Sequence, residues 1–176
     1  MSSMIPHARR SWRALAAVLL LLAAPAVRAQ VQNPPLAPLL LNVFPSRDFV
    51  SAGGYDDASR VVVKVIHPNG TVRSTDPSQP IAPSGGLVEV NHPGGACWFG
   101  VTPDIRTGDV VQIDIVSGPG SGRSDATTVA NITCRRPVQT GGHTIQVHGT
   151  AQDALGGPLP LAGLECRLVS PGDLFD

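Results

Sequence analysis

The chain of 176 residues is long enough for one ordinary domain, which excludes a large multidomain enzyme. Its 19 glycines and 17 prolines, with only 4% aromatic residues and no Gly-X-Y period, exclude collagen and favour short strands joined by turns over long helices. Four of its 13 basic residues lie in the first 29 positions, so the remainder carries 9 basic and 13 acidic side chains, a net charge of −4. This balance makes nucleic acid a poor partner.

Residues 1–29 have the composition of a signal peptide. A start with three arginines precedes an apolar run over 14–24 and the small-residue cleavage pattern Val-Arg-Ala at 27–29. The competing interpretation is a membrane anchor, but the apolar run has about half of the ~20 residues that span a bilayer. We therefore expect a mature chain that begins near Gln30, has no membrane span, and is secreted, periplasmic or held at the cell surface.

Residues 30–38, QVQNPPLAP, are a proline-rich spacer that we expect to run extended and outside any ladder. A β module is expected over 39–136, where short β-prone runs alternate with clusters of Gly, Pro, Asn, Asp and Ser, a spacing typical of an antiparallel sandwich. Including two runs beyond this module, the predicted strands are Leu39–Val43, Arg60–Ile66, Leu87–Val90, Cys97–Val101, Val110–Ile115, Thr127–Cys134, Thr144–Val147 and Leu164–Val169.

Two local patterns in this module are strong. Within 110–115, Val111, Ile113 and Ile115 alternate with polar residues, which puts the branched side chains on one face of a half-buried strand. Between the runs VVVKVI and TVRS, Asn69-Gly70 is the dipeptide that best accepts positive φ at both centres of a tight turn. This pattern predicts a hairpin at that turn.

The end of the chain is expected to be a separate and incomplete unit. Residues 137–142, PVQTGG, have the composition of a linker, and 143–176 offer only one further strand-turn-strand pattern. Chains below ~40 residues seldom bury a sufficient core alone. We therefore expect a partial second β module that either docks on the first or belongs to a longer repeat, with proteases cutting first in the linker.

The stretches FPSRDFVSAGGY, VKVIHPNGTV and NHPGGACWFGVTPDIRTGDVVQI carry a family resemblance. Over about 39–136 the chain resembles exported bacterial proteins with an immunoglobulin-like or fibronectin type III-like module. The tail TIQVHGTAQDALGGPLPLAGLECRLV is similar to the opening hairpin of bacterial Ig-like or carboxypeptidase-regulatory-like repeats. The resemblance implies an all-β, antiparallel, immunoglobulin-like sandwich that serves as a spacer, an adhesion element or an appended binding domain, and it supplies no catalytic residues.

Three cysteines in an exported chain leave one without a partner. If Phe99 faces the core, the alternation places Cys97 on the same inward side, and the phase of the run over 127–134 does the same for Cys134. These phases predict a Cys97–Cys134 disulfide and leave Cys166 as a buried thiol. The alternative is that all three are small core residues.

The same phase argument places Trp98 on the outer face of its strand, where an aromatic side chain could contact a ligand. Trp98 and Tyr55 are therefore the candidate binding residues. The alternative is that a neighbouring loop such as 51–55 covers the indole.

Histidines and aspartates give no pattern of metal ligands or of a catalytic centre. His67 and His92 mark turn entries, and His143 and His148, five residues apart, point to opposite faces of a strand. Carboxylates at Asp56-Asp57, Asp104, Asp109 and Asp153 could contribute to calcium sites, but hydrogen bonds within their own turns are the favoured interpretation. We predict no metal and no cofactor.

These patterns predict an exported, non-catalytic module that acts as a spacer or as an adhesion or binding element for a surface glycan or protein. The alternative is a carbohydrate- or surface-polymer-binding module appended to a larger protein or enzyme. An enzyme remains a third possibility, although no nucleophile elbow and no paired acid and base stand at a recognisable spacing.

Overall fold

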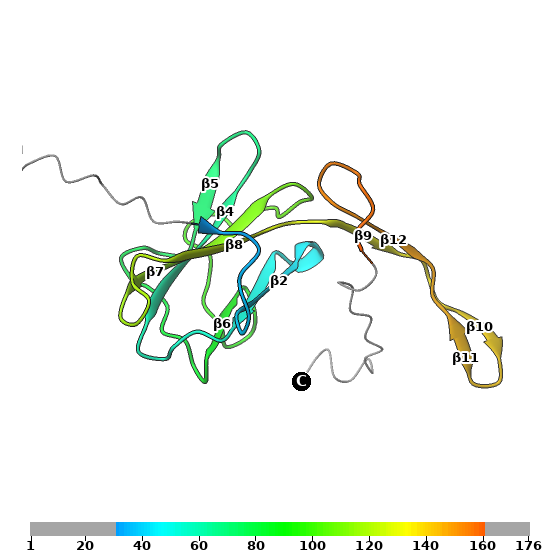
Figure 1. The fold of residues 1–176 in the computed structure, drawn as a ribbon, viewed down its shortest axis with the longest axis horizontal. Coiled ribbons are helices and arrows are strands. Elements are labelled where there is room, and N and C mark those ends of the chain that lie inside the picture. The colour runs from blue at the N-terminus through cyan, green and yellow to red at the C-terminus, as the bar shows by residue number, and fades with distance from the viewer. Residues whose placement is uncertain (1–30, 161–176) are drawn as a thin grey trace, which may run out of the picture.

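The computed structural model describes residues 31–160, and this part of the chain is all-β, as the sequence predicts (Figure 1). A five-stranded sheet has the order β1-β8-β7-β4-β5 and a three-stranded sheet the order β2-β3-β6, while β9 pairs with β12 and β10 with β11. The strands are β1 (Val31–Gln32), β2 (Leu40–Phe44), β3 (Phe49–Gly53), β4 (Arg60–Ile66), β5 (Val72–Ser74), β6 (Leu87–Val90), β7 (Val110–Ser117), β8 (Ser124–Thr128), β9 (Asn131–Cys134), β10 (Val138–Gly141), β11 (Thr144–Gln146) and β12 (Gly149–Gln152).

One hydrophobic core joins the two larger sheets. Its fully buried members come from β4 and β7 of the five-stranded sheet and from β3 and β6 of the three-stranded sheet. In β7 the predicted alternation is confirmed, because Val111, Ile113 and Ile115 are buried while their polar neighbours are only partly so. Burying one such branched side chain contributes about 1.5–3 kcal/mol. We call the part of the molecule built on this core, residues 31–129, the body.

The predicted hairpin at Asn69-Gly70 is confirmed, with a different turn from the one expected. β4 and β5 pair antiparallel, and the Gly70 N–H donates to the carbonyl of His67 at 2.9 Å. Of the two turn residues, only Gly70 has a positive φ, at 84°. Pro68 suits the second position of a type I turn over 67–70, so the left-handed conformation falls on the glycine at its fourth position.

Two of the predicted strands do not form as expected. Residues 97–101 form no named strand, and Trp98 makes only an isolated bridge to Thr75. The predicted strand Thr127–Cys134 divides into β8, which pairs with β7, and β9, which pairs with β12. The division falls at Val129, whose side chain is buried in the core and whose N–H donates to the Asp109 carbonyl. In addition, β3, the central strand of its sheet, was not predicted.

The two segments predicted to be spacer and linker both contain strands. Val31 and Gln32 of the spacer pair in parallel with β8, and residues 138–141 of the predicted linker form β10, the partner of β11. A linker was expected because Gly141-Gly142 adds flexibility, but two glycines between β-prone runs also suit a hairpin turn. The sheets divide near residue 130 instead of at 137–142.

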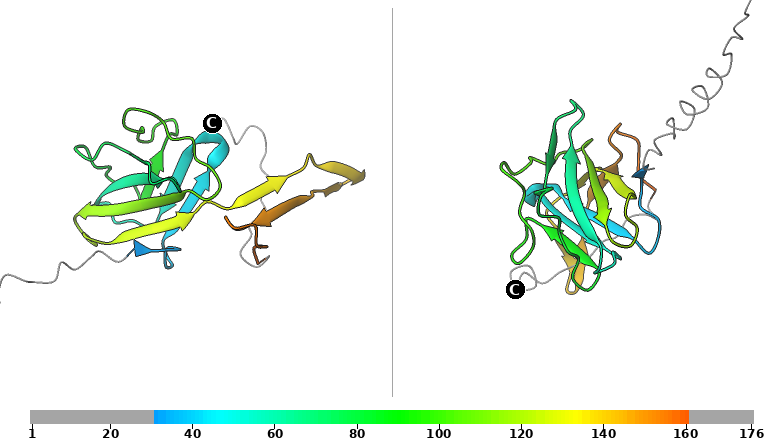
Figure 2. Two further views of the ribbon diagram at one scale, coloured as in Figure 1. Left: turned by 90° about the horizontal axis from the view of Figure 1, so that it is seen from above. Right: turned by 90° about the vertical axis from the view of Figure 1, so that its left-hand side faces the viewer.

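Residues 131–152 form what we call the arm, a two-stranded ribbon made of β9 to β12 that projects from the body (Figures 1 and 2). The predicted signal peptide over 1–29, the predicted strand Leu164–Val169 and Cys166 lie outside the described residues. Within 31–160 no helix has the length and apolar character needed to cross a bilayer.

Candidate functional site

An open groove of about 600 Å³ lies at one end of the body, between the β4–β5 hairpin and the loop over 101–109. The hairpin side of the groove is lined by His67, Pro68, Asn69, Thr71 and Arg73. The loop side is lined by Val101, Thr102, Pro103, Asp104, Arg106, Thr107 and Asp109. His67 continues the inward phase of β4, since it follows buried Val65 by two residues, so it points toward this loop and not toward the outer face of the sheet.

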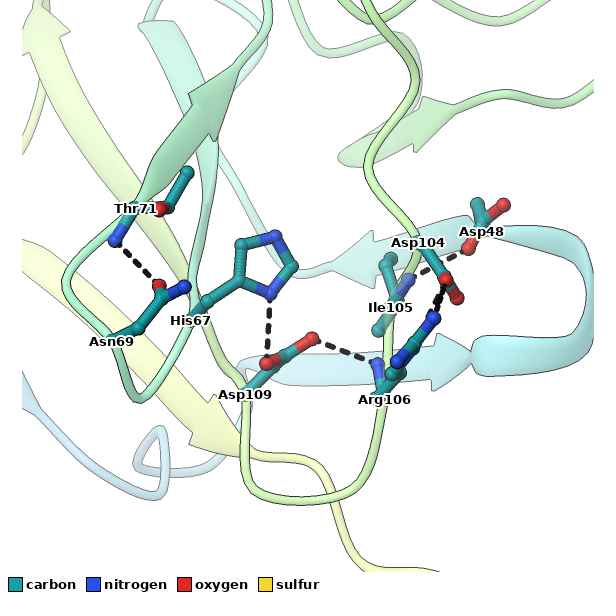
Figure 3. Close-up of polar contacts among 8 residues, drawn as sticks. All are labelled: Asp48, His67, Asn69, Thr71, Asp104, Ile105, Arg106 and Asp109. Atoms are coloured by element: carbon teal, nitrogen blue, oxygen red, sulfur yellow. Dashed lines mark hydrogen bonds and ion pairs between the residues drawn. The ribbon is translucent and has the colours of Figure 1, made fainter.

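A histidine and an aspartate that are 42 residues apart meet at this groove (Figure 3). His67 Nδ1 lies 2.9 Å from Oδ1 of Asp109, whose side chain is only 2% exposed. The second carboxylate oxygen of Asp109 accepts the backbone N–H of Arg106 at 2.7 Å. Burying a carboxylate is costly unless it is hydrogen-bonded, and here both oxygens have partners. Asp109 therefore joins the hairpin to the loop.

The loop over 101–109 is fixed from its other side by Asp48 (Figure 3). The Asp48 carboxylate accepts the N–H of Ile105 at 2.8 Å, and the Asp48 carbonyl accepts the Trp98 indole N–H at 2.9 Å. Asp48 has a left-handed backbone with φ of 49°, a conformation that aspartate tolerates better than most residues. Ile105 is buried in the core, so this wall of the groove is anchored by both packing and hydrogen bonds.

Asp104 and Arg106 form an ion pair at the rim of the groove. The hydrogen bond from the Arg106 guanidinium lowers the pKa of Asp104, and the same contact raises the pKa of Arg106. Both side chains remain charged near neutral pH. Because both are mostly exposed, the pair adds little to stability, and its effect is to neutralise charge locally.

Neither of the two predicted binding residues is exposed. Trp98 is 7% and Tyr55 3% exposed, so the expected outward position of Trp98 is wrong. The β2–β3 connection covers the indole, since Asp48 accepts its N–H, whereas loop 51–55 was the expected cover. The Tyr55 hydroxyl donates to Asp125 at 3.4 Å. Burial, reinforced by the Asp125 carboxylate, raises the pKa of Tyr55 strongly, so this phenol stays protonated.

The predicted Cys97–Cys134 disulfide is wrong in this structure, where both thiols are free and exposed. Residues 97–101 have the opposite phase to the one expected: Trp98 faces inward, while Phe99 and Val101 are 62% and 63% exposed. Cys134 lies on the arm, where β9 pairs only with β12. The inward phase on which the pairing depended is therefore absent at both positions.

The remaining aspartate candidates lie apart from the groove: Asp56 and Asp153 cap their own turns, and Asp57 holds a distant one. Asp56 accepts the N–H of Ala58 at 2.8 Å, Asp57 that of Gly86 at 2.7 Å, and Asp153 that of Leu155 at 2.9 Å. Across residues 31–160 no group of three His, Cys, Asp or Glu side chains is placed to hold a metal ion. His143 and His148 are exposed on the arm, and His92 contacts Glu89 at 3.5 Å.

Sequence reasoning considered Asp104 with Asp109 as possible calcium ligands and His67 as a turn entry, and did not bring the histidine and the aspartates together. The inward phase of β4, extended by one step past Val65, was the one signal that could have placed His67 toward the interior. Nothing local links it to Asp109. Comparisons of the chain with protein-family models, curated proteins and solved structures found no match.

Proposed function

We propose that this chain is an exported, non-catalytic immunoglobulin-like module that binds a surface glycan or protein in the groove between the β4–β5 hairpin and loop 101–109. The observation that carries this proposal is that both walls of the groove are held in place independently of any ligand. Asp109 ties the hairpin to the loop, and Asp48 ties the loop to the β2–β3 connection. A site with pre-ordered walls loses less conformational entropy when its ligand binds.

The interpretation as a binding module, and not an enzyme, rests on what surrounds His67. Its pairing with Asp109 has the geometry of a general base with an orienting acid. A hydrolase of the serine or cysteine type also needs a side-chain nucleophile in hydrogen-bond contact with that base, and among the described residues no hydroxyl or thiol donates to His67. Asp109 already has a structural role, because it accepts the backbone N–H of Arg106. This role accounts for the burial of its carboxylate without a catalytic function.

Export is part of the proposal and is supported by the signal-peptide composition of 1–29. A second candidate function, a spacer within a larger surface protein, is favoured by the arm, which projects from the body as a connection to a further module would (Figure 2). The two functions are compatible.

The proposal is tested by recording amide chemical shifts of the mature protein during titration with soluble neutral and acidic oligosaccharides and with solubilised cell-surface protein. We expect saturable shifts that cluster at Thr71, Thr102 and Thr107. Saturable binding with shifts confined to the arm would contradict the groove assignment. Turnover of glycosides or esters that is abolished by His67→Gln, in a variant with an unchanged melting temperature, would contradict the non-catalytic interpretation.

A further inference from the structure

Five ionisable side chains line the described groove, and four of them are engaged with one another. Asp104 pairs with Arg106, and Asp109 with His67. Arg73 is the fifth, and within residues 31–160 it forms neither an ion pair nor a side-chain hydrogen bond. Both carboxylates of the groove already have hydrogen-bond partners, so Arg73 is the charged group of the lining that is left open to a ligand.

The pairing of β4 with β5 aims Arg73 at the groove. Arg73 lies directly opposite Val65, and cross-strand partners project from the same face of a sheet. Val65 is fully buried, so this is the inner face, and Arg73 occupies it at the point where the core ends and the groove begins. His67 projects from that face too, with Nδ1 held by Asp109 and the other ring nitrogen turned away from that carboxylate (Figure 3).

The uncharged part of the lining is rich in hydroxyl and amide groups with unused hydrogen-bonding capacity. The hydroxyls of Thr71, Thr102 and Thr107 have no intramolecular partner among the described residues. Asn69 uses its oxygen to accept the Thr71 N–H at 2.9 Å, which leaves its NH₂ group free. Several small donors and acceptors suit a ligand with many hydroxyl groups better than a peptide, which binds through sheet edges or apolar pockets.

Resting on the proposed binding function, we propose that the groove takes an acidic sugar. The Arg73 guanidinium binds its carboxylate through two parallel hydrogen bonds, and the threonine hydroxyls and the free nitrogen of His67 exchange hydrogen bonds with the ring hydroxyls. The ion pair between Asp104 and Arg106 keeps the opposite rim neutral, so it does not repel the carboxylate. Arginine is suited to this task because its planar fork matches a carboxylate.

The experiment measures binding of the mature protein to oligogalacturonate and to its methyl ester, which has the same ring and hydroxyl groups without the charge. We expect the acid to bind at least about tenfold more tightly than the ester, the size of one charge-assisted contact. Arg73→Gln should bring the affinity for the acid down to that for the ester. Arg135→Gln, which removes an equal charge on the arm, should leave both affinities unchanged. Arg73 is exposed, so its variant is expected to fold, and the melting temperature checks this.

Other outcomes overturn the inference in distinguishable ways. If acid and ester bind equally well and shift the groove amides, the proposed function stands and the acidic specificity is wrong. If Arg135→Gln weakens binding as much as Arg73→Gln, the attraction is a diffuse charge effect. If oligogalacturonate does not bind but an aspartate-rich peptide shifts the groove amides, the ligand is a protein and not a sugar. If none of these ligands shifts Thr71, Thr102 or Thr107, the acidic-sugar assignment fails, and the proposed function itself is then decided by its own wider titration.

Discussion

The body and the arm are made of similar β-prone sequence and differ completely in burial. In the body, Val111 and Ile113 of β7 are fully buried because a second sheet lies against them. In the arm, Ile132 and Ile145 are 65% and 52% exposed, because each strand has only one neighbour and no second layer. β propensity therefore decides where the strands form, and a facing sheet decides whether they contribute a core.

The largest expected difference between the two regions is in the effect of truncating an isoleucine. Ile113→Ala removes a fully buried side chain and should lower the free energy of unfolding by about 2–5 kcal/mol. Ile145→Ala in the arm should change it by less than about 0.5 kcal/mol. Urea denaturation of both variants measures this. Equal losses would mean that the arm packs against a surface in solution and that the contrast is wrong.

The connection between hairpin and loop gives the next largest effect. Asp109→Ala leaves the Arg106 N–H and His67 Nδ1 without their partner in a buried place, so we expect a loss of about 2–4 kcal/mol. Asp104→Asn is the matched control, since it removes a neighbouring carboxylate that is exposed, and the melting temperature should hardly move. A small effect of Asp109→Ala would show that the groove walls are held by packing alone.

A smaller effect is expected at Trp98, the one tryptophan after residue 29. Trp98→Phe keeps the aromatic burial and loses the hydrogen bond to the Asp48 carbonyl, which should cost about 1–2 kcal/mol in thermal unfolding. In an unsubstituted protein that begins at Gln30, tryptophan emission should be that of a buried indole with little quenching by acrylamide. Strong quenching would show that loop 97–101 opens and that its assignment to the body needs revision.

The smallest effect concerns a carboxylate on the outer face of the body. Burial raises the pKa of Asp114, but hydrogen bonds from Lys64, Ser124 and Gln112 outweigh it, so the pKa is lower than in the unfolded chain. The ionised Asp114 carboxylate therefore contributes fully to stability above its pKa in the unfolded chain, which is near 4. This contribution is lost as the pH falls through the lower pKa that Asp114 has in the folded protein. Because the site is partly exposed, this amounts to less than about 1 kcal/mol.

Asp114→Asn should accordingly flatten the dependence of the melting temperature on pH below about 4. Asp153→Asn, in the turn that follows the arm, is the control. If the two substitutions change the melting temperature at acid pH to the same extent, the contact between Lys64 and Asp114 does not stabilise the body.

The elements that were predicted correctly from the sequence are those whose structure is determined by residues close together in the chain. The branched runs gave β4 and β6 with their observed bounds, and the alternation of Val111 with Ile113 and Ile115 gave the buried face of β7. Asn69-Gly70 gave the hairpin. Chain-local patterns therefore predict the all-β class and three of the strands on which the core is built.

The errors arise where a contact with a residue far away in the sequence determines the position of a side chain. The inward position of Trp98 depends on the Asp48 carbonyl, 50 residues away, and the alternation of 97–101 contains no trace of it. Likewise, His67 and Asp109 have separate local explanations as a turn entry and a turn aspartate, and only the packing of loop 101–109 on the hairpin unites them. The arm was missed because Gly141-Gly142 is equally consistent with a linker and with a hairpin turn.

The two attachments of loop 101–109 have a mechanical consequence. A force applied to a ligand bound in the proposed groove would act on the loop first and would then divide between two routes. One passes through Asp48 into β2 and β3, and the other through Asp109 and His67 into the β4–β5 hairpin. The tension would thus reach both sheets at once, and rupture would require two sets of hydrogen bonds to fail together instead of one after the other.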